Sequence, residues 1–282
     1  MIASFIPRHV SNRALLTVYR LLAVFGVPRF VRRNHLRENR IRLEQTNRDF
    51  WHAPDAYIEN QSEWTKIRFG VGRRQSMSYA GCEIIATYNA RKALGKPVSK
   101  KFMAELINTY EARGAALWGA FGVAPTMIAA YFRKNGFQVE TADDADAEAV
   151  EEISRNSKVM IATAYNDKND ITGQIHTVCI TKNREGQFVL HNAYYRDEKG
   201  RFRESRPYMT FWEAVSHISR RSPKLIYLIG IRCAVSGMEG KGNHLRRHFL
   251  PEPHVMLHKE KRRSVFQEQF LNLHPGEYVD II

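Results

Sequence analysis

The hydrophobic pattern of the chain is helical in the first half and strand-like in the second. Apolar residues recur at intervals of three and four along residues 82–93 and 99–113, and a third such stretch runs from Pro125 to Asn135-Gly136. This spacing is typical of amphipathic helices, and the Gly and Pro residues that follow are stop signals. We therefore predict three consecutive helices, each with one buried face.

The second half contains short apolar runs rich in β-branched residues, which indicate strands. They lie at residues 158–164, on both sides of a turn at residues 182–186, and at residues 224–232, the last of which looks like a central strand. Two short helices are predicted among them, an acidic one over residues 143–156 and one that follows a capping box at Thr210. Helices followed by antiparallel strands predict an α+β fold.

The beginning of the chain holds a separate apolar stretch, residues 14–30. It is bracketed by arginines, Arg20 interrupts it and Pro28 ends it. The stretch is too short for a membrane-spanning helix, and no small-residue cleavage site follows it, so we do not expect a cleaved signal peptide. Two interpretations stay open: a helix docked on the domain, or a basic amphipathic helix in the interface of an anionic membrane.

The net charge of +14 is unevenly distributed along the chain. Residues 1–75 carry 14 Lys/Arg against 6 Asp/Glu, whereas residues 76–240 carry 22 against 18. A segment with such an excess of basic residues attracts acidic surfaces such as membranes or nucleic acids. Aromatic residues do not interleave with the basic ones in any nucleic-acid-binding motif, so we expect no specific nucleic-acid partner.

The length of 282 residues and the 44 % apolar content predict one large domain with appendages. We predict a basic helical arm over residues 1–60 and a catalytic domain over residues 61–235. The Gly- and Pro-containing residues 236–282 are predicted to form a polar tail.

The cysteines, Cys82, Cys179 and Cys233, are odd in number and have no Cys-x-x-Cys spacing. This usage argues against a disulfide framework and predicts a reducing compartment. We therefore expect a cytoplasmic protein, peripheral to a membrane if the arm lies on one. The histidines are scattered and form no ligand motif, so no metal and no cofactor are expected.

Cys82 is placed for chemistry at the start of the first predicted helix. The unpaired amides and partial positive charge of a helix N-terminus favour an anion, so this position predicts a lowered thiol pKa and preferential alkylation of Cys82. The alternative is that Cys82 is a small buried hydrophobic residue, as many free cysteines are.

Two further polar residues, His176 and Asn192, lie on the predicted hairpin of residues 174–195. His176 opens the first predicted strand and Asn192 lies near the end of the second, so antiparallel pairing brings the two side by side. A base and a group that orients it would then be neighbours.

The chain order of Cys at a helix start, His at a strand start and Asn sixteen residues later resembles that of papain-like cysteine peptidases. Among these, the chain is most similar to the bacteriocin-leader peptidase domains of peptide-exporting transporters, over about residues 75–232. The resemblance implies Cys82 as nucleophile, His176 as general base and acid, Asn192 as orienter and Gln75 as oxyanion donor. The family's glutamine usually stands six residues before the cysteine, where this chain has Ser76, so the choice between Gln75 and Ser76 stays open.

The resemblance implies thiol-dependent acyl transfer, with hydrolysis of a peptide or protein substrate as the expected reaction. Transglutaminases, acyltransferases and deamidases use the same set of residues, so these reactions remain alternatives. A rival from another class is a non-catalytic, basic, membrane-associated binding protein on the same scaffold.

Overall fold

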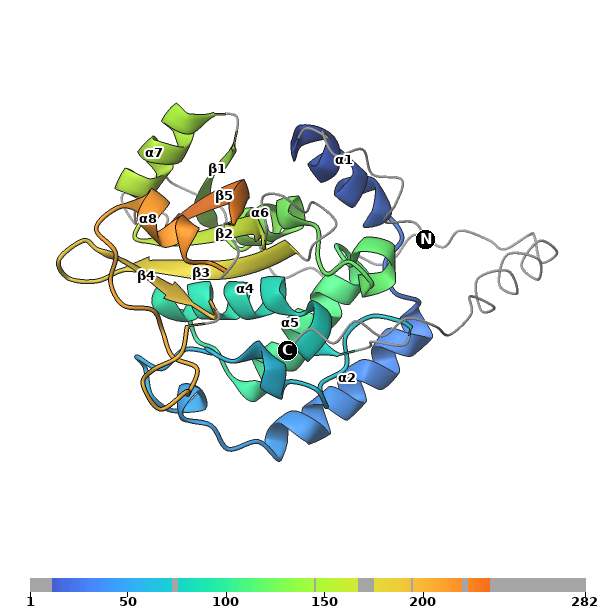
Figure 1. Ribbon diagram of the computed structural model, residues 1–282. Helices are drawn as coiled ribbons and strands as arrows, with labels where there is room; N and C mark the ends of the chain where they lie inside the picture. Colours follow the sequence, from blue (N-terminus) through green and yellow to red (C-terminus); the bar gives the residue numbers. More distant parts are fainter. Residues whose placement is uncertain are drawn as a thin grey trace, which may run out of the picture. The chain divides into compact units, whose positions relative to one another are not determined.

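The computed structural model describes residues 12–72, 76–144, 146–166, 175–193, 195–219 and 223–233. All of them belong to one unit, Met1–Val235, shown in Figure 1. The second unit, Ser236–Ile282, and with it the predicted tail, lies outside the described residues.

A five-stranded antiparallel sheet forms the centre of the unit, with the strand order β1-β5-β2-β3-β4. The strands are β1 (Phe137–Asp143), β2 (Val159–Tyr165), β3 (Ile175–Lys182), β4 (Phe188–His191) and β5 (Lys224–Cys233). The last apolar run of the sequence is central, as predicted, since β5 lies between β1 and β2. Every residue of β2 is buried, because helices cover both faces of the sheet.

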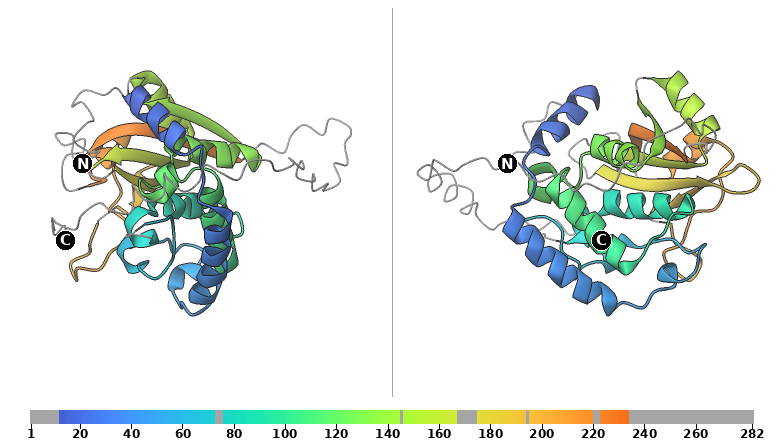
Figure 2. Two further views of the ribbon diagram at one scale, coloured as in Figure 1. Left: turned by 90° about the vertical axis from the view of Figure 1, so that its right-hand side faces the viewer. Right: turned by 180° about the vertical axis from the view of Figure 1, so that it is seen from behind.

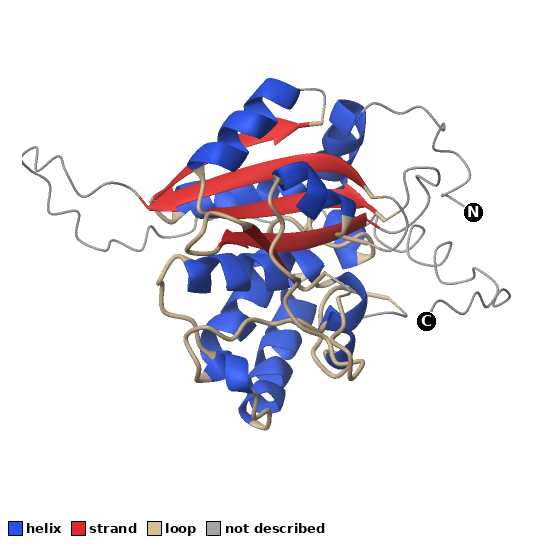
Figure 3. Cartoon of the chain, turned by 60° about the vertical axis from the view of Figure 1, so that its left-hand side comes forward, coloured by secondary structure: helices blue, strands red, loops and turns tan. Residues whose placement is uncertain are grey.

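The helices lie on both faces of this sheet (Figure 3). They are α1 (Asn12–Leu22), α2 (Arg29–Glu44), α3 (Met77–Ala80), α4 (Cys82–Ala93), α5 (Lys100–Ala112), α6 (Pro125–Lys134), α7 (Ala147–Asn156) and α8 (Phe211–Ser216). One core cluster joins α4, α5 and α6 to residues such as Ile161 and Cys179 of the sheet. A second cluster joins α7 and α8 to Val178 and Ile180 on the opposite face. The α+β prediction is confirmed.

Local sequence signals account for several of these helix boundaries. The Ser99 hydroxyl accepts a hydrogen bond from the Phe102 amide at 3.0 Å and caps α5, and the Thr210 hydroxyl caps α8 by accepting from the Glu213 amide at 3.1 Å. Pro125 opens α6 at the first turn, where its missing N–H is not needed. The three predicted helices of the first half are thus confirmed.

The sequence did not lead us to predict β1, and the predicted start of the acidic helix at residue 143 was too early. Residues 137–143 pair with β5 at the edge of the sheet, and α7 begins only at Ala147. Most side chains of β1 are partly exposed, so the strand lacks the continuous apolar run that marked the others.

The apolar stretch of residues 14–30 does not form one helix. Helix α1 ends at Leu22, and α2 begins at Arg29, directly after Pro28. Leu15 and Leu16 of α1 are buried and belong to a cluster with residues of β2 and β5. No helix within the described ranges is both long enough and apolar enough to cross a bilayer.

A buried polar cluster fixes α2 against α5. Nδ1 of His35 lies 2.6 Å from the Glu111 carboxylate, which also accepts a hydrogen bond from the Gly70 amide at 2.9 Å. Asn39 exchanges two hydrogen bonds with the backbone of Arg68, at 2.8 and 2.7 Å. These contacts make the end of the predicted arm part of the same packed unit.

Candidate functional site

Cys82 is the first residue of α4, and the glycine before it allows the backbone to turn sharply from α3 into α4. The short helix α3 ends at Ala80, and Gly81 turns the backbone into α4. A Cβ on Gly81 would lie 2.5 Å from the carbonyl oxygen of Met77, so only glycine fits this close approach. The predicted helix start at Cys82 is confirmed.

The Cys82 thiol is buried, with 6 % of the residue exposed. Its neighbours include the backbone of Thr177 in β3 and the carboxylate of Glu83. Burial raises the thiol pKa well above its ordinary value, and the charge of Glu83 raises it further. The expectation of a lowered pKa was therefore wrong for this conformation, since desolvation and a negative neighbour outweigh the helix N-terminus.

Glu83 is a second buried ionisable group at this point, with 3 % of the residue exposed. Its Oε2 atom has no hydrogen-bond partner among the described residues. Burial raises the pKa of Glu83 to about 7, partly offset by hydrogen bonds that include the Val123 amide. Tyr19 of α1 lies near enough that charges on Glu83 and Cys82 raise its pKa, although burial is the larger cause. An acid and a thiol are therefore buried next to each other, and the partly buried phenol of Tyr19 lies near them.

His176 and Asn192 are neighbours, as the predicted hairpin requires. Nε2 of His176 lies 2.6 Å from the backbone carbonyl oxygen of Asn192. Burial lowers the pKa of His176 to about 4, and the bond to this carbonyl partly counters the shift. Because a carbonyl oxygen only accepts hydrogen bonds, Nε2 carries the proton of the neutral ring and Nδ1 carries the lone pair.

The Asn192 side chain contacts Gln61. Its Oδ1 accepts a hydrogen bond from the Gln61 amide at 3.0 Å, and its Nδ2 donates to the Gln61 side chain at 3.3 Å. The backbone of Asn192 has a φ of 64°, a left-handed conformation that asparagine tolerates better than most residues. The contact between the imidazole and Asn192 in this structure is thus with the main-chain carbonyl.

The thiol of Cys82 contacts β3 at Thr177, the residue directly after His176. Cys82 meets the backbone of Thr177, whose side chain lies on the α4 side of the sheet with that of Cys179. Side chains alternate along a strand, so the ring of His176 leaves β3 on the other side, with Val178. The structure thus gathers Cys82, His176 and Asn192 at one end of β3, with thiol and ring on different sides of the strand.

The predicted oxyanion donor is not placed by the structure, because Gln75 lies outside the described residues. Ser76 precedes α3, and its hydroxyl lies 2.8 Å from the Ser78 hydroxyl. Gln61, which the sequence reading did not single out, donates from Nε2 to the Ser78 carbonyl at 3.1 Å and so links the Asn192 loop to the segment before Cys82. A single glutamine in a polar loop carries no sequence signal for this role.

Within the described part of the chain, one group of residues offers ligand atoms that could hold a cation. Oxygen or nitrogen atoms of Glu59, His191 and Glu204 lie within 4.8 Å of one another. Both ring nitrogens of His191 are already engaged, Nδ1 with Glu59 at 2.8 Å and Nε2 with the Thr181 hydroxyl at 2.9 Å. Glu59 also accepts from the Asn192 amide at 2.7 Å. These hydrogen bonds give Glu59 and His191 a structural role, which is to hold the turn that follows β4.

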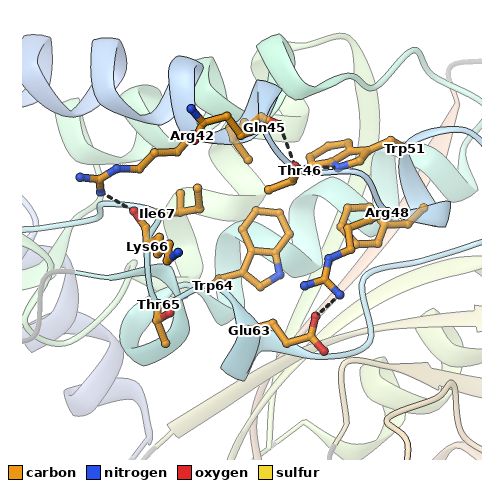
Figure 4. Close-up of a pocket in the computed structure, with 12 residues that line it drawn as sticks. Arg42, Gln45, Thr46, Arg48, Trp51, Glu63, Trp64, Thr65, Lys66 and Ile67 are labelled. Carbon is orange, nitrogen blue, oxygen red and sulfur yellow. Dashed lines mark hydrogen bonds and ion pairs between the residues drawn. The ribbon is translucent and has the colours of Figure 1, made fainter.

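A hollow of about 300 Å³ lies elsewhere, between the C-terminal end of α2 and the following loops (Figure 4). Its lining includes two tryptophans and several charged residues: Arg42, Arg48, Trp51, Glu63, Trp64 and Lys66. Arg48 is paired with Glu63 at 2.6 Å. Of the predicted catalytic residues that the structure describes, Cys82, His176 and Asn192, none lines this hollow.

Comparison with known proteins gave no match to a protein-family model, to a curated protein or to a solved structure.

Proposed function

We propose that the protein catalyses thiol-dependent acyl transfer, with Cys82 as nucleophile and a peptide or protein as acyl donor. The observation that carries the proposal is the position of Cys82 at the N-terminus of α4, against β3 at the residue after His176. The order of thiol, imidazole and asparagine along the chain, and the packing of the α4 helix on an antiparallel sheet, support the same reading.

His176 is the proposed general base. Its bond to the Asn192 carbonyl fixes the tautomer with the lone pair on Nδ1, which is the state needed to take the thiol proton. Because the ring leaves β3 on the side away from Thr177, this transfer requires the start of β3 and the turn at Asn192 to move together, so that Nδ1 faces the thiol while Nε2 keeps its bond to the Asn192 carbonyl. Asn192 acts in this proposal through its main chain, and its side chain holds the turn to Gln61.

The reaction then follows in balanced steps. Nδ1 of His176 takes the Cys82 proton, the sulfur bonds to the substrate carbonyl carbon, and the oxyanion lies at the N-terminal amides of α4. The carbon–nitrogen bond breaks as the imidazolium gives its proton to the leaving amine, which leaves a thioester on Cys82. Water attacks the thioester, its proton passes to Nδ1 and then to sulfur, and the acid and the free thiol are released. An amine in place of water gives the transferase reaction instead.

In the conformation described, the thiol and the imidazole are both neutral. Burial raises the pKa of Cys82 and lowers that of His176, so neither carries a charge near neutral pH. Because Cys82 and Glu83 are buried, we include an opening step in which substrate binding exposes the thiol.

The test is turnover of a mixture of short peptides, with and without an added amine acceptor, by the full chain in a Cys233→Ser background. This background removes the exposed thiol. Cys82→Ser should abolish new products, and His176→Gln should reduce them at least 100-fold. Cys179→Ser, which changes a buried thiol outside the proposed site, should retain them. Product formation that survives Cys82→Ser would refute the proposal, and the amine-dependent products decide between hydrolysis and transfer.

A further inference from the structure

The connection between α1 and α2 turns apolar side chains toward the solvent. Val24, Phe25 and Phe30 are 66 %, 74 % and 71 % exposed, and Val18 and Leu21 on the outer side of α1 are exposed next to them in sequence. We call these five residues the elbow surface. Exposed apolar surface of this kind can mark an interaction site when it is contiguous.

The fold holds this surface in place. Ala23 and Val27, which alternate with the exposed residues, are buried, and the Val27 amide donates to the Glu111 carbonyl at 2.7 Å. A Cβ on Gly26 would lie 2.2 Å from the Ala112 carbonyl oxygen, so the connection passes directly over the end of α5. Figures 1 and 2 show it on the side of the unit away from α8. The outward direction of Val24 and Phe25 is therefore fixed by packing.

A row of arginines continues from the elbow surface along α2. Arg29, Arg33 and Arg37 are exposed and four residues apart, so they lie on one face of the helix. None of the three has an acidic partner among the described residues, whereas Arg40, the next in the row, pairs with Glu105 at 3.3 Å. Phe30 lies at the edge of the same face. An uncompensated positive face thus adjoins an exposed apolar one.

We propose that the elbow surface and Arg29, Arg33 and Arg37 bind the surface of an anionic phospholipid bilayer. Apolar side chains would enter the boundary between headgroups and acyl chains, and the guanidinium groups would contact the lipid phosphates. Arginines and phenylalanines also suit single-stranded nucleic acid, where aromatic rings stack on bases. Val18, Leu21 and Val24 have no ring to stack, so the aliphatic share of the surface favours lipid.

The experiment is co-sedimentation of the full chain with vesicles of phosphatidylcholine, with and without phosphatidylserine. We expect binding that requires phosphatidylserine and weakens at high salt. An arginine near an anionic surface contributes about a fivefold factor in affinity, so Arg29→Glu with Arg33→Glu should weaken binding about 25-fold or more. Phe25→Ser with Phe30→Ser should weaken it at least 10-fold. Both pairs change exposed side chains, so the protein should stay folded.

Matched controls lie on other parts of the unit. Arg184→Glu with Lys199→Glu makes the same change in net charge at exposed positions, and Met209→Ser removes an apolar side chain that is 71 % exposed. Neither should change binding more than twofold. The proposal is overturned if the chain does not bind phosphatidylserine vesicles, if the controls weaken binding as much as the elbow variants do, or if the elbow variants lose binding to single-stranded RNA while vesicle binding is unaffected.

Discussion

Glu83 and His176 should give the protein two opposing pH dependences of stability, which single substitutions can separate. Burial lowers the pKa of His176 from 6.5 to about 4, so the unfolded chain binds more protons between these values. The stability contribution of His176 is complete above pH 6.5 and is lost as the pH falls to 4. Burial raises the pKa of Glu83 from 4.5 to about 7, so its contribution is complete below pH 4.5 and is lost as the pH rises to 7.

The two effects overlap between pH 4.5 and 6.5 and have similar size there. Each changes the free energy of unfolding by about 1.4 kcal/mol per pH unit in this window, with opposite sign, so they nearly cancel in the wild type. Glu83→Gln removes the contribution that falls as the pH rises. The free energy of unfolding of this variant minus that of the wild type should therefore rise by about 3 kcal/mol from pH 4.5 to 6.5. For His176→Gln, the same difference in the free energy of unfolding should fall by a similar amount.

The assay is urea unfolding at several pH values across this window, with each variant compared with wild type so that the other titrating groups are common to both. Glu105→Gln is the control, because its side chain is 48 % exposed and should leave the slope unchanged. Parallel curves for wild type and Glu83→Gln would show that the carboxylate titrates as an ordinary exposed group, and the account of this buried cluster would then be wrong.

Three further predictions follow from the contacts around the site and the helical half. Iodoacetamide should modify exposed Cys233 well before buried Cys82 and Cys179, and mass spectrometry that finds Cys82 first would contradict the closed conformation. Glu111→Ala leaves His35 and the Gly70 amide without their buried partner and should lower the unfolding free energy by about 3 kcal/mol or more, whereas Glu105→Ala should cost about 0.5 kcal/mol or less; equal losses would refute the cluster's role. Asn192→Gly keeps the carbonyl and the left-handed backbone and should retain turnover, so a loss as large as that of His176→Gln would return the orienting role to the side chain.

Much of the fold could be predicted from the sequence because its signals are local. Helical spacing predicted α5 and the capping box at Thr210 predicted α8, and apolar runs predicted the strands β2 to β5. The edge strand β1 lacks such an apolar run because most of its side chains are partly exposed to solvent. Pro28 was a local signal for the break between α1 and α2, whereas the close approach of Gly26 to α5 is a tertiary contact that no local pattern reveals.

The candidate site was only partly predictable for a similar reason. The start of α4 at Cys82 and the pairing of His176 with Asn192 follow from periodicity and a turn. The pKa directions do not, because they depend on burial and on Glu83, a charge that looks like an ordinary exposed residue in the sequence. Gln61 lies far from Asn192 in the chain, and only the tertiary structure brings them together.

The most direct test of the proposed chemistry is the detection of an acyl-enzyme on Cys82. Full-length protein in the Cys233→Ser background is incubated with a peptidyl thioester, quenched in acid and measured by intact mass spectrometry with peptide mapping. We expect one acyl group per chain, located on Cys82, absent from Cys82→Ser and formed at least 100-fold more slowly by His176→Gln. Acylation of Cys179 instead, or a Cys82 adduct that forms equally fast without His176, would contradict the proposed chemistry.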